Sequence, residues 1–181
     1  MLAEAAALLA LAAPGDAAHA FAVEVARGGA RPAGSAAEAR AQRQVADRFR
    51  AAGLTVRVQR FSTPRGRSRN VIGVREGAGD CLRVLMAHAD SMPALRSPVG
   101  APRRGVEREL LRAAAPAGAR LDWRRGDGTG NSDHRELELA GRRAVKLGGL
   151  DNPCRHQACD TPDRLRKGAF RVVTRLLLRV L

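Results

Sequence analysis

The sequence predicts an α/β fold, a three-layer αβα sandwich built around a mixed, mostly parallel sheet. Segments with helix-like and strand-like patterns alternate along the chain, as they do in sheets flanked by helices. The most continuous apolar run of strand length is Cys81–Ala87 (CLRVLMA), which predicts a central strand covered on both faces. At 181 residues the chain is long enough to bury a core, so we expect residues 1–181 to form a single domain.

The N-terminal segment, residues 1–29, is rich in alanine and predicts one or two helical segments broken at Pro14-Gly15. Its apolar run also has the length of a secretory signal peptide and ends in small residues. No positively charged region precedes that run, and Glu4 lies within it. An Ala-rich helix is therefore at least as good an interpretation as a leader.

A helix followed by a hairpin comes next. Ser35 and Glu38 have the spacing of a capping box, so a helix should begin there and end just before Gly53. Thr55–Phe61 alternates apolar and polar residues, as a half-buried strand does. Asn70–Val74 follows a turn rich in glycine, proline and arginine, and is a plausible hairpin partner for that strand.

The second half of the chain is less regular. Residues 92–105 are rich in proline, glycine and arginine and predict an irregular segment. Val106–Ala115 predicts a helix, and Leu137–Ala140 predicts part of another. Arg120–Arg124 and Ala144–Leu147 predict short strands.

A helix is expected at the C-terminus. Thr161 precedes Pro162, a favoured pair for the cap and the first position of a helix. Apolar residues then recur at helical spacing from Leu165 to Val180. These features predict one amphipathic helix that begins at the cap.

The chain is strongly basic, with a net charge of +14, and Lys146 and Lys167 are its only lysines. Such a charge attracts anionic partners. The arginines are scattered along the chain, however, and aromatic residues that could stack on bases make up only 3% of it. A compositional bias explains the charge better than nucleic-acid binding, so we expect no nucleic-acid partner. No stretch approaches the length of a membrane span.

The first chemical motif, His88-Ala89-Asp90-Ser91, follows directly after the expected central strand. Polar residues just beyond the carboxyl end of such a strand occupy the usual ligand position of open α/β sheets. A histidine can bind a metal through one ring nitrogen while a carboxylate accepts a hydrogen bond from the other. The alternative is a strand-end turn whose polar residues face solvent.

The second motif is the loop that contains His156 between Cys154 and Cys159. The two cysteines are close enough in sequence for a disulfide. Closing so short a loop stabilises the folded chain by roughly 2 kcal/mol. A cysteine pair favours an oxidising compartment, secreted or periplasmic. The alternative is a surface turn closed by a disulfide, in which the histidine has no functional role.

In this order the motifs resemble the zinc aminopeptidases of metallopeptidase family 28, relatives of glutamate carboxypeptidase and glutaminyl cyclase. The resemblance covers residues 31–91, with RPAGS, NVIGV and HADS. It also covers residues 106–181, with TGNSDH, an Ala-Gly pair and NPCRHQACDTPDRL. It implies a two-zinc enzyme that hydrolyses N-terminal peptide bonds with metal-activated water. The substrate would be a peptide or an amino-acid amide.

The resemblance also implies roles for individual residues. His88 and His156 would each bind one zinc ion, and Asp90 would orient the first site. Asp133, in Ser-Asp-His, would lie near the substrate and the bound water. The two cysteines match a disulfide that occurs in some members of the family.

The chain departs from the family where the chemistry is most demanding. The family has an aspartate that bridges both metals shortly after its His-x-Asp motif, but Met92–Gly100 contains no acid. It also has a Glu-Glu pair, one base and one zinc ligand, and no Glu-Glu occurs in this chain. A further carboxylate ligand has no counterpart, and Arg155 replaces an aromatic residue. An internal deletion within residues 92–105 accounts for the missing acids.

These departures leave the general base unknown. A hydrolytic zinc site needs about three protein ligands per metal and a base. Glu107 and Glu109 are the nearest acids, and their spacing places them on different faces of the predicted helix. Solvated helix charges describe them better than substitute ligands do. Three hypotheses follow: an aminopeptidase, a non-catalytic remnant that binds metal or peptide weakly, and an Arg-rich module for anionic partners. We favour the second.

Overall fold

The chain divides into two compact units, and each is described by itself. What we call the helical unit comprises Met1–Val23, Arg96–Arg155 and Cys159–Leu181. The hairpin unit comprises Glu24–Leu95 and His156–Ala158. The computed structural model describes the following residues of these units: 15–79, 82–91, 106–121, 133–142, 144–147, 153–154 and 157–180.

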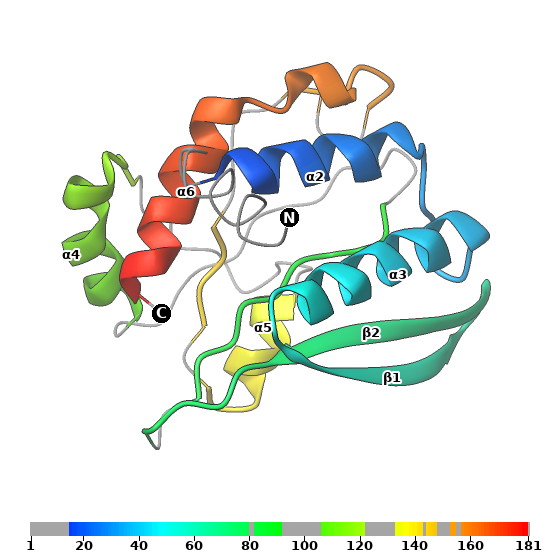
Figure 1. The fold of residues 1–181 in the computed structure, drawn as a ribbon, viewed down its shortest axis with the longest axis horizontal. Helices are drawn as coiled ribbons and strands as arrows, with labels where there is room; N and C mark the ends of the chain where they lie inside the picture. The colour runs from blue at the N-terminus through cyan, green and yellow to red at the C-terminus, as the bar shows by residue number, and fades with distance from the viewer. Residues whose placement is uncertain are drawn as a thin grey trace, which may run out of the picture. The chain divides into compact units, whose positions relative to one another are not determined.

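The hairpin unit consists of one helix and a two-stranded antiparallel sheet. Helix α3 (Ala36–Ala51) runs along the hairpin formed by β1 (Thr55–Thr63) and β2 (Gly66–Val74), as Figure 1 shows. The strands pair in register from one end to the other, with Val58 opposite Val71. The predicted helix and hairpin are confirmed, and both strands are longer than expected.

The N-terminus of α3 has a modified capping box. The Ser35 hydroxyl accepts a hydrogen bond from the Glu38 N–H at 3.1 Å, as the spacing predicts. The Glu38 carboxylate, however, accepts from the N–H of Gly34 at 2.7 Å. Gly34 has φ +82°, and a side chain there would collide with the Arg65 carbonyl oxygen, 2.9 Å from the Cβ position. Glycine is therefore required at this turn.

The helical unit is built on two helices that pack side by side. Helices α4 (Val106–Ala117) and α6 (Lys167–Val180) lie together in Figure 1 and share a small apolar core. That core consists of Leu110, Ala113, Ala114, Ala117 and Leu176. A short helix, α5 (Asp133–Leu139), belongs to the same unit.

The predicted start of the C-terminal helix is wrong. Pro162–Arg164 forms a single 3₁₀ turn, η1, and Thr161 makes no capping hydrogen bond through its side chain. Leu165 then adopts an extended conformation, and its carbonyl oxygen lies 2.8 Å from His19 Nε2. A carbonyl bound to a distant side chain does not continue the helix, so α6 begins only at Lys167.

The start of helix α2 (Asp16–Arg27) contacts α6 through polar groups. The Asp16 carboxylate binds the guanidinium of Arg171, with Nη2 at 2.9 Å, and the ammonium of Lys167 at 3.0 Å. The Arg171 hydrogen bond, followed by that of Lys167, holds the pKa of Asp16 well below its usual value. The predicted helix before residue 29 is thus confirmed over residues 16–27 and anchored electrostatically.

The fold class is mixed α/β, as predicted, but the sheet is not the one expected. The sheet found in the described residues is the antiparallel hairpin. Residues 82–87, the expected central strand, have no regular secondary structure, and Leu82 is 87% exposed. An apolar run forms a strand only when neighbours supply partners for its backbone N–H and C=O groups. No described strand does so here.

The short strands expected later in the chain are not strands where the structure describes them. Residues 120–121 and 144–147 have no regular secondary structure, although Ala144 is buried. The mostly parallel sandwich is therefore not found in the described part of the chain. Among those residues, no helix is both long enough and apolar enough to cross a membrane.

Candidate functional site

The His-x-Asp motif forms a compact turn in the hairpin unit. His88 Nδ1 lies 3.3 Å from Asp90 Oδ1. The histidine side chain is 59% exposed and the aspartate 29%, so the acid lies deeper than the base. When Nδ1 carries the ring proton it donates to the carboxylate, and this hydrogen bond fixes which ring nitrogen could bind a metal.

Arg31 holds this turn in place from the opposite end of the unit's sequence. Its N–H donates to Ser91 Oγ and its carbonyl accepts from the Ser91 N–H, both at 2.8 Å. Its Nε donates to the carbonyl of Ala89 at 3.2 Å. Its Nη1 donates to the carbonyls of Val25 and Gly29, near the end of α2, at 3.1 and 2.9 Å. The backbone on both sides of Asp90 is thus tied to one arginine. We call this set of contacts the Arg31 clasp.

The sequence predicts no role for Arg31. It begins the motif RPAGS, but a guanidinium can donate to any nearby carbonyl. The partner at Ala89 lies 58 positions away in sequence. Only the folded chain shows which carbonyls it reaches.

Asp133 lies in the other unit, at the first position of α5, where a negative charge is favourable for a helix. Its side chain is exposed. The next residue, His134, is buried, with 5% of its surface exposed. Its Nδ1 makes no hydrogen bond within the described part of the chain. An unsatisfied buried nitrogen is unfavourable, and no periodicity in this short motif indicated that the histidine would be inside.

Cys154 and Cys159 form a disulfide in the helical unit, with their Cα atoms 5.2 Å apart. Cys154 is buried, while Cys159 is exposed. His156, the second expected zinc ligand, lies outside the described residues. So does Arg155 beside it.

The described residues do not contain a complete set of ligands for a metal ion. Among them, no group of three or more histidine, cysteine, aspartate or glutamate side chains could hold a metal ion. His88 and Asp90 belong to the hairpin unit, whereas Asp133 belongs to the helical unit.

Neither a family model, nor a curated protein, nor a solved structure matches the chain. The likeness to zinc aminopeptidases therefore depends on the sequence motifs alone. It stays a prediction, together with the roles it implies for His88, Asp90, Asp133 and His156.

Proposed function

We propose that this chain is a non-catalytic relative of the zinc aminopeptidases. In this proposal its ancestor had the three-layer sandwich with a mostly parallel sheet, and an internal deletion removed the strands that bear the acids. The observation that carries the proposal is the lack of any Glu-Glu pair between His88 and Asp133, where the family has its base. The His88–Asp90 pair and His156 are features of the ancestral site that the chain retains.

Chemistry explains why the missing acids matter more than the retained histidines. A metal-bound water becomes a nucleophile only when a neighbouring base takes its proton. Without that base a peptide bond has no activated water to attack it. A site with His88 and Asp90 could retain a metal weakly, or accept a peptide weakly, but it would not turn over substrate.

The disulfide and the basic surface refine the proposal. A Cys154–Cys159 bridge persists in an oxidising compartment, which supports a secreted or periplasmic location. The scattered arginines give no reason to add a nucleic-acid partner. The expected ligands are zinc, at one ion per chain or fewer, and a peptide or amino-acid amide.

The test is a zinc measurement combined with a peptidase assay. The purified chain is stripped with a chelator, reloaded with zinc and dialysed exhaustively, and its zinc content is measured. A chromogenic leucine amide then reports aminopeptidase activity. We expect no more than one zinc per chain and no zinc-dependent release of leucine.

Two variants make the result specific. His88→Ala should lower any zinc retained by the chain, whereas Glu76→Gln, at an exposed acid in the same unit, should not. Two zincs per chain, with leucine release that His88→Ala abolishes, would show an active peptidase and overturn the proposal.

A further inference from the structure

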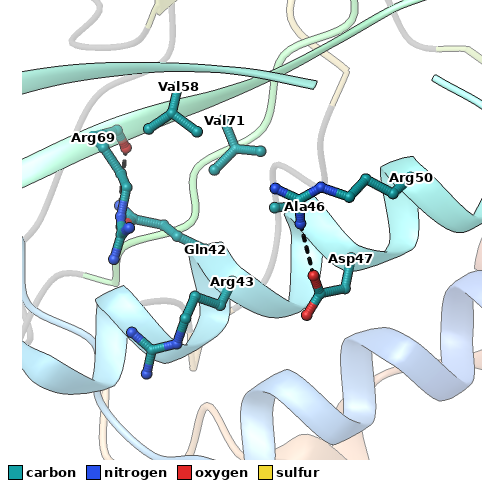
Figure 2. A pocket seen from close by; sticks show the side chains of 8 residues that line it. All are labelled: Gln42, Arg43, Ala46, Asp47, Arg50, Val58, Arg69 and Val71. Carbon is teal, nitrogen blue, oxygen red and sulfur yellow. Dashed lines mark hydrogen bonds and ion pairs between the residues drawn. The ribbon is translucent and has the colours of Figure 1, made fainter. Parts of the chain in front are cut away.

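Helix α3 and the hairpin enclose a pocket of about 220 Å³ in the hairpin unit, shown in Figure 2. Its apolar wall is formed by Ala46 of α3 and by Val58 and Val71, which face each other across β1 and β2. Arginines from both the helix and the sheet line the rest of it, together with Gln42 and Asp47. The pocket therefore combines an apolar surface with positive charge.

One of these arginines is held in a fixed orientation. Arg69 Nε donates to Gln42 Oε1 at 2.9 Å, and Gln42 Nε2 donates to the Arg69 carbonyl, also at 2.9 Å. Gln42 is only 2% exposed, and its Nε2 also donates to Glu38 Oε1 at 2.8 Å. The Glu38 carboxylate is itself buried and accepts from Ser68 Oγ at 2.6 Å. This network leaves Gln42 little freedom, so Arg69 is anchored at Nε.

The positive charge around the pocket is only partly neutralised. Asp47 accepts a hydrogen bond from Arg50 at 2.8 Å, and Figure 2 shows that pair at one end of the pocket. Arg43 and the Nη groups of Arg69 lie toward the other end, and neither has a side-chain acceptor among the described residues. Among the residues that line the pocket, three arginines against one aspartate leave an excess of two positive charges. Such a site attracts an anion.

We propose that this pocket binds a short aliphatic carboxylate. Arg69 and Arg43 would hold the carboxylate, because a guanidinium matches its two oxygens with parallel hydrogen bonds. The hydrocarbon part would lie on Val58, Val71 and Ala46, where it removes apolar surface from water.

The pocket volume limits the size of the ligand. Pockets for drug-sized ligands measure roughly 300–1,000 Å³, so this one has room for a group the size of a single side chain. A free branched-chain acid and the last residue of a peptide share this chemistry. The pocket does not include His88, so its ligand is independent of the proposed function.

The binding test uses the full chain and follows backbone amide signals by NMR during titration with 4-methylpentanoate. We expect saturable shifts at Gln42, Ala46, Val58 and Val71. The neutral amide, 4-methylpentanamide, keeps the hydrocarbon and loses the charge. Acetate keeps the charge and loses the hydrocarbon. Each should bind about tenfold more weakly or worse, since each lacks one of the two interactions.

Matched variants separate a site from general attraction to a basic protein. Arg69→Gln and Arg43→Gln should each weaken 4-methylpentanoate binding about tenfold, because each removes a charged hydrogen bond. Arg57→Gln makes the same charge change on β1 at a position that alternates away from Val58, and should change the Kd by less than about twofold. Arg43 is exposed on α3, so its replacement tests the site even if Arg69→Gln fails to fold.

Equal losses in all three variants, or equal binding of acid and amide, would overturn the proposal. The peptide N-acetyl-Ala-Leu then distinguishes the two sources of the carboxylate. Binding about tenfold tighter than that of 4-methylpentanoate would identify a peptide C-terminus. Equal or weaker binding would identify a free acid, and both results keep the carboxylate site.

Discussion

The two units differ in the kind of side chain that they bury. In the helical unit the buried side chains between α4 and α6 are apolar, and Leu176 is 1% exposed. In the hairpin unit three of the buried side chains are polar, namely Glu38, Gln42 and Ser68. Apolar packing is not directional, whereas a buried polar group is favourable only when specific partners reach it. In the hairpin unit, directional hydrogen bonds therefore fix the positions of the buried polar side chains.

The same difference applies to the two sites proposed above, both of which lie in the hairpin unit. The Arg31 clasp fixes the turn that carries His88 and Asp90. The Glu38 network fixes Arg69 at the pocket. In each case an arginine is held by named acceptors, which reduces the ordering that a ligand would have to impose.

The largest loss of stability is expected in the helical unit. Leu176→Ala removes a fully buried side chain and should lower the free energy of unfolding by roughly 2–5 kcal/mol. Leu178→Ala, on the same helix but 65% exposed, should cost less than about 1 kcal/mol. Hydrogen exchange of the α4 and α6 amides measures both. Similar losses for the two variants would show that the apolar core is not what stabilises this unit.

The next largest loss of stability is expected in the hairpin unit. Glu38→Leu keeps the bulk but leaves the donors of Gln42, Ser68 and Gly34 without their acceptor, and should cost roughly 2–3 kcal/mol. The α3 amides should exchange correspondingly faster. Glu24→Leu is the matched control, because that carboxylate also accepts from two side chains, Gln44 and Arg48, but is 49% exposed. It should cost no more than about 1 kcal/mol, and an equal cost at both positions would contradict the comparison.

A smaller and more local effect is expected at the clasp. Ser91→Ala removes the acceptor of the Arg31 N–H and should destabilise the turn by about 1 kcal/mol. The amide of residue 91 should exchange faster, and the NMR signals of His88 should shift. Ser62→Ala, at an exposed position of β1, should change neither. Unchanged protection at residue 91 would mean that the clasp does not order the turn.

The smallest effect is a change in acid sensitivity of the helical unit. The Arg171 hydrogen bond lowers the pKa of Asp16, so the stability it contributes is present above pH 4 and lost as the pH falls further. Asp16→Asn should therefore be less stable than the native chain at pH 6, with the difference shrinking below about pH 4. Thermal unfolding across that range measures it. A difference that does not depend on pH would exclude this ion pair as its cause.

Features whose causes are local could be predicted from the amino-acid sequence. The Ser35 cap and the end of α3 before Gly53 depend on neighbours within a few residues, and the structure confirms them. Strand β1 forms where its alternation predicts a strand, but most of its residues are exposed, so the predicted half-burial is wrong. Helical spacing likewise predicted α4 and most of α6. Mixed α/β composition follows from these elements together.

Features that depend on residues distant in sequence could be seen only in the folded chain. Residues 82–87 have the composition of a central strand, but a strand also needs adjacent strands to pair with, and pattern alone cannot supply them. Thr161 makes no capping hydrogen bond through its side chain, and the Leu165 carbonyl oxygen is bound by His19, a residue far away in sequence. Arg31, Gln42 and Arg69 are polar residues in a chain rich in arginine, so nothing local distinguishes them from solvated neighbours. Their roles appear only because hydrogen bonds are directional and the fold brings specific acceptors within reach.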